Sequence, residues 1–111
     1  MIEHVAENYE RYMDLLSARQ KLVASNLANA DTPGYKTKDI DFQFEFMSLI
    51  EGVAPQAREV QGLAVKNDGN NVSIDREARL LAENGIRFSL VSTLARAKLR
   101  TLRNAIQEGR V

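Results

Sequence analysis

The chain has 111 residues, which is enough for one ordinary domain. Its 15 Lys and Arg side chains balance 15 Asp and Glu side chains, and this zero net charge argues against whole-chain attraction to nucleic acid. The chain has no cysteine, which excludes disulfide and thiolate chemistry. The only histidine is His4, so histidine metal clusters and Ser-His triads are excluded as well. We therefore expect no catalytic residues, no metal and no cofactor, and an enzyme is the least expected class.

The charges are unevenly distributed along the chain. Residues 1–55 carry five basic and nine acidic side chains, whereas residues 56–111 carry ten and six. Halves of opposite sign attract each other or attract neighbouring copies of the chain. No apolar run approaches the roughly 18 residues of a membrane span, and no signal segment opens the chain. We expect no direct membrane insertion.

The first segment predicts an amphipathic helix over residues 2–29, because its apolar residues recur at steps of three, four or seven. Pro33 cannot continue a helix, and Pro33 followed by Gly34 is typical of a type II-like turn that ends it. The apolar stripe consists of Ile2, Val5, Tyr9, Tyr12, Leu16, Val23 and Leu27.

The irregular middle is residues 31–74. Apolar residues alternate as in a strand at Ile40, Phe42, Phe44 and Phe46. Helical spacing fits Phe42, Phe46, Leu49 and Ile50 instead, and we favour a short helix capped by Asp39 or Asp41. Residues 52–62 are expected to form a loop. Residues 63–65 could pair with residues 72–74 in a small β-hairpin, since an Asp-Gly pair lies between them.

The last segment predicts a second long helix over residues 75–109, with Asp75 as N-cap and Gly109 as its stop. Gly85 costs about 1 kcal/mol relative to Ala and allows a kink or break. The apolar stripe is Leu81, Phe88, Val91, Ala95, Leu99, Leu102 and Ile106. Basic residues crowd the final turns: Arg96, Lys98, Arg100, Arg103 and Arg110.

The fold class is therefore all-α, with the terminal helices pairing as an extended coiled-coil-like hairpin within a single domain, residues 1–111. Helices of about 28 and 33 residues are roughly 42 and 50 Å long, whereas a compact domain of this size has a radius of gyration of about 13 Å. One helix cannot cover the narrow stripe of the other completely. Either the helices are broken or other copies complete them, as in an oligomer or filament.

Residues 17–36 resemble the N-terminal signature of flagellar basal-body rod and hook proteins. The core of that signature is Ala-Ser-Asn-Leu-Ala-Asn at 24–29, followed by Thr-Pro-Gly-Tyr at 32–35. Residues 37–42 and 69–77 are similar to proximal rod subunits. The resemblance covers about residues 10–45 and 66–110, and the middle between Phe46 and Lys66 is shorter than expected of the family.

The resemblance implies a structural subunit of the proximal rod of the bacterial flagellum, which polymerises through its terminal helices into a hollow shaft that transmits torque and lines the export channel. It implies export by the flagellar type III apparatus without a cleaved signal peptide, and a place in the periplasmic rod of the basal body. The implied partners are other copies, other rod subunits, the rod–MS-ring adaptor and the export gate.

Two sets of residues are the candidate sites. For subunit interaction along the inter-helix seam we expect Leu16, Val23, Leu27, Phe88, Val91, Leu99, Leu102 and Ile106. For the junction that ends the first helix we expect Asn26, Asn29, Pro33, Gly34 and Tyr35. The two asparagines either set the register of packed helices by hydrogen bonding or end the helix and cap the turn. Asp39 and Asp41 are interpreted as helix caps or ion-pair partners of the basic helix rather than as acid–base groups.

Two other classes compete with the rod interpretation. The first is a cytoplasmic helical-bundle adaptor protein, which the stripes and the charge asymmetry alone would allow. The second is a small nucleic-acid-binding helical protein that uses its basic tail, whose affinity would fall steeply with salt. Zero net charge and the acidic first half count against it, and we expect no nucleic-acid partner.

Overall fold

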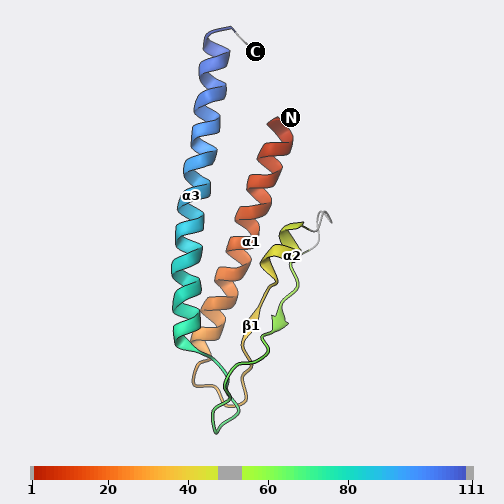
Figure 1. Ribbon diagram of the computed structural model, residues 1–111, viewed down its shortest axis with the longest axis vertical. Coiled ribbons are helices and arrows are strands. Elements are labelled where there is room, and N and C mark those ends of the chain that lie inside the picture. The colour runs from red at the N-terminus through yellow and green to blue at the C-terminus, as the bar shows by residue number, and fades with distance from the viewer. Residues whose placement is uncertain (1, 48–53, 110–111) are drawn as a thin grey trace.

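Two long helices dominate the computed structural model, which describes residues 2–47 and 54–109. Helix α1 spans Ile2–Ala28 and helix α3 spans Ile74–Gln107, and the two run antiparallel as an extended hairpin (Figure 1). The molecule measures 67 × 26 × 18 Å, with a radius of gyration of 18.2 Å. The predicted all-α hairpin is confirmed, and the shape is much longer than that of a compact domain.

Helix α3 begins one residue earlier than predicted and runs without a break past Gly85. Its N-cap is Ser73, not Asp75. Ser73 has an extended backbone, and its Oγ accepts a hydrogen bond from the backbone N–H of Arg76 at 3.2 Å. Asp75 lies in the first turn, where a negative charge complements the helix dipole. The helix stops before Gly109, whose φ of 70° is the left-handed conformation that commonly ends helices.

The described part of the middle, residues 31–47 and 54–73, contains three short elements between the long helices. Strand β1 (Lys38–Asp39) pairs antiparallel with strand β2 (Arg58–Glu59), and helix α2 (Phe42–Met47) lies between them in sequence. The short helix favoured by the sequence is confirmed over Phe42–Met47, and the Oδ1 of Asp41 caps it by accepting the N–H of Phe44 at 3.1 Å. Leu49 and Ile50, which also belong to the predicted helical spacing, lie outside the described residues. The segment expected to be a loop contains β2, and its first residues, 52–53, lie outside the described residues.

The predicted hairpin between residues 63–65 and 72–74 is wrong. The tight turn around Gly69 does form, but the chain on its C-terminal side is held elsewhere. The side-chain Oδ1 of Asn71 accepts the backbone N–H of Thr37 at 2.7 Å, so this segment bonds to the residues that follow α1. Hydrogen bonds to a distant segment have replaced the local strand pairing.

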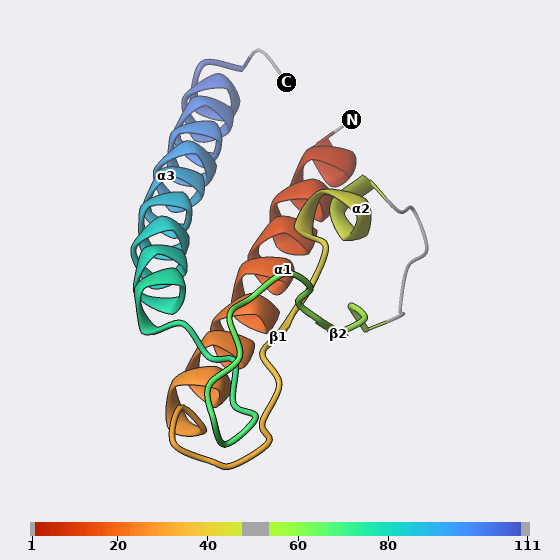
Figure 2. The same cartoon turned by 60° about the horizontal axis from the view of Figure 1, so that its bottom comes forward.

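Helix α1 is the central element of the molecule. Helix α3 lies along one side of it, and the middle elements lie along another (Figures 1 and 2). The apolar core is Leu15, Leu16, Val23, Ile40, Val72, Leu80 and Val91. All buried residues of the described chain fall between positions 15 and 91. We call residues 15–47 and 54–91 the base, and residues 92–109, the outer part of α3 and its cap, the tip.

Candidate assembly interface

The junction after α1 is a tight turn built from local chemistry. The backbone N–H of Tyr35 donates to the carbonyl of Thr32 at 3.2 Å, and Gly34 has a φ of 76°. Pro33 fixes the first central position of this turn and Gly34 supplies the left-handed second one, which is the type II pattern that the sequence predicts.

Asn26 connects this junction to both long helices. Its side-chain amide donates to the carbonyl of Lys38 at 2.8 Å and to Oε1 of Glu77 at 2.7 Å. Its Oδ1 accepts the hydroxyl of Tyr35 at 2.9 Å and the N–H of Lys38 at 3.1 Å. All the hydrogen-bonding capacity of a buried amide is used, so Asn26 sets the register of α1 against α3 within one chain.

Asn29, in contrast, makes only local side-chain bonds. Its amide donates to the carbonyl of Ser25 at 2.8 Å, and its Oδ1 accepts the hydroxyl of Thr32 at 3.0 Å. These are bonds of a helix end and the turn that follows it. The two asparagines of the signature therefore perform the two different roles that the sequence left open.

Two buried carboxylates hold the base together. Arg19 forms a two-pronged contact with Asp39, at 3.1 and 3.0 Å, and Arg76 reaches the same carboxylate at 2.6 Å. Arg76 also pairs at 3.0 Å with Glu77, which is completely buried. Burial raises the pKa of the Glu77 carboxyl above its ordinary value of 4.5, although the Asn26 hydrogen bond and the charge of Arg76 oppose this shift.

Asn70 fastens the loop before α3 onto the end of α1. Its buried amide donates to the carbonyls of Asn29 and Thr32, both at 2.8 Å. The loop approaches so closely that a Cβ added to Gly69 would lie 3.3 Å from the Cα of Gly34, and Gly69 has a φ of 87°. Any larger residue at position 69 would meet both a steric and a conformational penalty.

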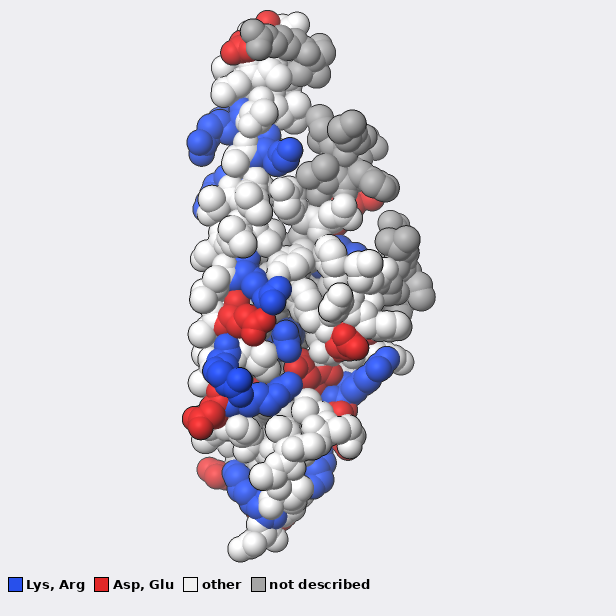
Figure 3. Space-filling view, in the orientation of Figure 1, with Lys and Arg blue, Asp and Glu red and all other residues white. Residues whose placement is uncertain are grey.

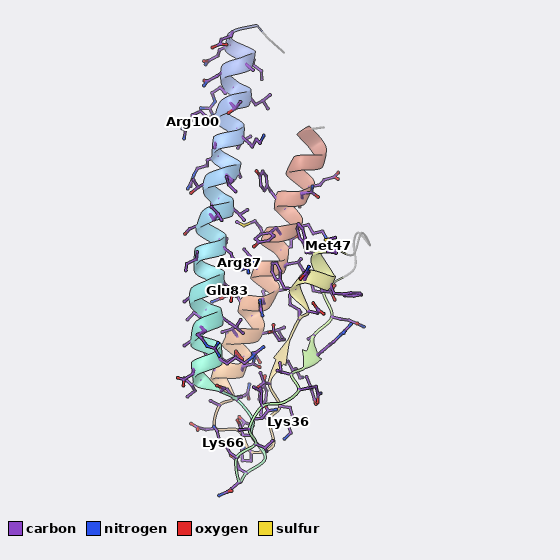
Figure 4. All side chains as sticks on the ribbon, in the orientation of Figure 1. Lys36, Met47, Lys66, Glu83, Arg87 and Arg100 are labelled. Atoms are coloured by element: carbon purple, nitrogen blue, oxygen red, sulfur yellow. The ribbon has the colours of Figure 1, made fainter. Side chains whose placement is uncertain are left out.

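An aromatic cluster closes one side of the helix pair. Tyr12 packs edge-on against Phe42 and Phe46 of α2, with ring centroids 5.2 and 5.5 Å apart. Arg87 donates to the Tyr12 hydroxyl at 2.9 Å and pairs with Glu83 at 2.9 Å, and both charged residues lie on the same side of α3 (Figure 4). This side of the hairpin is therefore sealed by contacts within the chain.

The predicted subunit-interaction residues divide into three groups by exposure. Leu16, Val23 and Val91 are buried between the helices of one chain. Leu27 and Leu102 are half-buried. Phe88, Leu99 and Ile106 are 52%, 61% and 58% exposed. Only the half-buried and exposed groups have apolar surface left for another chain, and contact between subunits at these positions stays a prediction.

The tip combines exposed apolar residues with basic ones. No residue of the tip is buried in the described chain, and positive side chains gather on the outer part of α3 (Figure 3), where Arg100 points away from α1 (Figure 4). Within the described residues, no cluster of three or more His, Asp or Glu could hold a metal ion, and no helix has the apolar length to cross a membrane.

Sequence reasoning missed three residues that organise the base. Glu77 and Asn70 are completely buried polar groups, and Arg76 joins two carboxylates. Their only signal was the similarity of residues 69–77 to rod subunits, because nothing in local periodicity predicts a buried carboxylate in the first turn of a helix.

Comparison with known proteins identifies the family. The sequence profile described as "Flagella basal body rod protein" matches residues 13–36, which form the end of α1 and the junction. Flagellar basal body rod protein FlgB of Salmonella typhimurium is 30% identical to this chain, over 87% of the chain and 88% of that protein. The chain belongs to the FlgB family of flagellar basal body rod proteins.

Members from distant organisms show the same extent of similarity. The FlgB protein of Borrelia hermsii is 35% identical to this chain, over 76% of the chain and 82% of that protein. The FlgB protein of Aquifex aeolicus is 31% identical, over 89% of the chain and 90% of that protein. The Salmonella alignment extends over 122 positions, more than the 111 residues of this chain, so that relative carries inserted residues. As a member of the family, this chain is a structural subunit of the flagellar rod and assembles with other components of the basal body.

Proposed function

We propose that the chain polymerises through α1 and α3 into the proximal rod, a hollow shaft that transmits torque and lines the export channel. The observation that carries this proposal is the tip, where α3 continues beyond its packed part with its apolar side chains exposed. Exposed apolar surface of this kind along a helix is typical of a site that another helix covers. Residues 1–111 act in this proposal as one rod-subunit domain.

The proposed partners follow from the same membership. The subunit contacts other copies, other rod subunits, the rod–MS-ring adaptor and the export gate, in the periplasmic part of the basal body. It reaches that place through the flagellar type III apparatus, without a cleaved signal peptide. The proposal includes no catalysis, no nucleic-acid binding and no membrane insertion, and family membership leaves the cytoplasmic adaptor without support.

The test replaces half-buried Leu102 of the tip with aspartate. In a strain whose own gene is deleted, Leu102→Asp should abolish motility and leave basal bodies without rods, while export of the variant protein continues. Leu27→Asp, at the junction end of α1, should do the same. Electron microscopy and peptide mass spectrometry of purified hook–basal bodies measure the result.

The matched control is Asn104→Asp, which introduces the same charge at an exposed polar position two residues away. It should support normal swimming. Normal motility of Leu102→Asp would contradict polymerisation through the tip. Absence of the wild-type protein from purified basal bodies would contradict the proximal-rod assignment itself.

A further inference from the structure

The side of the helix pair lined by Leu81 and Phe88 is open. A groove of about 420 Å³ lies there between α1 and α3, lined by Ser17 and Lys21 on one wall and by Leu81, Gly85 and Phe88 on the other. Leu81 and Phe88 are 44% and 52% exposed. A Cβ added to Gly85 would meet no atom within 4 Å, so the glycine leaves the groove deeper at its centre.

The α1 wall of the groove continues into an acidic surface. Glu10 and Asp14 precede Ser17 and Lys21 at steps of three and four residues, which places all four on one face of the helix. All four side chains are exposed. A ligand helix lying in the groove would meet negative charge along this wall towards the N-terminal end of α1.

The tip has the complementary surface. Leu99 and Ile106 are seven residues apart and form one exposed apolar ridge on α3. Arg96 and Arg103, also seven residues apart and exposed, flank this ridge on one side. The tip therefore presents a narrow apolar edge with a positive border.

We propose that the groove receives the tip of α3 from a second copy of this chain. Leu99 and Ile106 of the second copy fill the space beside Gly85, and its arginines at 96 and 103 face Glu10 and Asp14. The proposal rests on the proposed function, since it names the partner surface through which copies polymerise.

A single chain cannot make this contact. One wall of the groove and the tip belong to the same unbroken helix, α3, and Gly85 and Leu99 are 14 residues apart, which is about 21 Å along the helix axis. The contact therefore joins two different surfaces of two copies. Repeated from copy to copy, such a heterologous contact generates an open helical assembly of the kind that a rod requires.

Disulfide trapping tests the contact, because the chain has no cysteine of its own. The variants pair Ser17→Cys with Leu99→Cys, or Ser17→Cys with Ile106→Cys, in one chain. Disulfides require Cα atoms about 4.4–6.8 Å apart, so neither pair can close within a chain and every crosslink is between chains. The control moves the first cysteine to exposed Gln43 on α2.

Oxidised hook–basal bodies should show a ladder of linked subunits on non-reducing gels for at least one Ser17 pair, and no ladder for the Gln43 pairs. Assembled rods that contain the Ser17 variants without a ladder would overturn the groove contact and leave the rod assignment intact. A ladder from the Gln43 pairs alone, or a link from Ser17 to a different protein, would overturn it equally. Absence of wild-type protein from the basal bodies would overturn both proposals.

Discussion

The base and the tip of this molecule differ in which side chains they bury and expose: the base buries polar groups, and the tip exposes apolar ones. In the base, Asn26, Asn70 and Glu77 are polar or charged and almost or completely inaccessible to water. In the tip, Leu99 and Ile106 are apolar and more than half exposed. Each arrangement is costly unless partners compensate for it.

The base finds its partners within the chain. Asn26 alone bonds to residues of the junction, β1 and α3, and Asp39 binds arginines from both long helices. Such bonds have strict geometry, so they specify one arrangement of α1, the junction and α3. The apolar ridge of the tip remains exposed among the described residues, and in our proposal another chain covers it. In this proposal the base is the part that folds by itself, and the tip is the part that assembles.

The largest effect on the free energy of unfolding should come from Asn26. Replacement by leucine leaves the Glu77 carboxylate and the Lys38 backbone groups without their amide partner, so Asn26→Leu should lower the free energy of unfolding by about 3 kcal/mol. Asn29→Leu is the control, because Asn29 makes only local bonds and should cost about 1 kcal/mol. Urea unfolding followed by circular dichroism measures both. Equal losses would break the distinction between a register-setting and a helix-ending asparagine.

Glu77 should give the base a distinctive pH dependence. Burial raises the pKa of this carboxyl in the folded state, so the folded chain binds the proton more tightly than the unfolded chain. Its contribution to stability is therefore fully present below the unfolded pKa and is lost as the pH rises through the folded pKa. Arg76 and Asp39 are the charged groups that face it, and they act in opposite directions.

The measurement compares wild type with Glu77→Gln, which cannot titrate at this position. The free energy of unfolding of wild type minus that of the variant should fall as the pH rises from 4 to 7. The difference removes the contribution of the other carboxyl groups. A difference that grows with pH would show that the ion pair with Arg76 outweighs burial at this site.

The smallest effect on the isolated subunit should come from the ridge of the tip. Leu99 is 61% exposed, so Leu99→Ser should change the free energy of unfolding by less than about 0.5 kcal/mol. Leu16→Ser, at a position that is 2% exposed in the base, should cost about 3 kcal/mol. Thermal unfolding of the purified chain distinguishes the two. A large loss from Leu99→Ser would mean that the tip is packed within the subunit, and the division into base and tip would fail.

Elements formed by interactions between residues close in sequence were easier to predict than elements that depend on contacts between distant residues. The long helices and the turn at Pro33 depend on periodicity and on local backbone preferences, so the sequence predicted them closely. The sequence predicts Asp75 as the N-cap of α3, but Ser73 can also cap a helix, and the backbone conformation selects Ser73. The hairpin at 63–74 failed because Asn71 bonds to the distant Thr37.

The candidate site shows the same difference between local patterns, which the sequence reveals, and contacts between distant residues, which it does not. Asn26, Pro33 and Gly34 were found from the family signature, and the apolar stripe of α3 from its spacing. The stripe alone could not separate Val91, which α1 buries, from Leu99, which remains exposed. The partners of Asn26 lie 9 to 51 residues away in sequence, beyond the reach of any local pattern.

By itself, the sequence determined that two long amphipathic helices flank an irregular middle, and that residues 17–36 carry the signature of the flagellar rod. These properties depend on contacts within a few residues and on a continuous motif. Only the tertiary structure decided which apolar residues and which polar groups are buried within a single chain. That outcome depends on the relative lengths and register of α1 and α3, which the bonds of Asn26, Asp39 and Glu77 set across the whole chain.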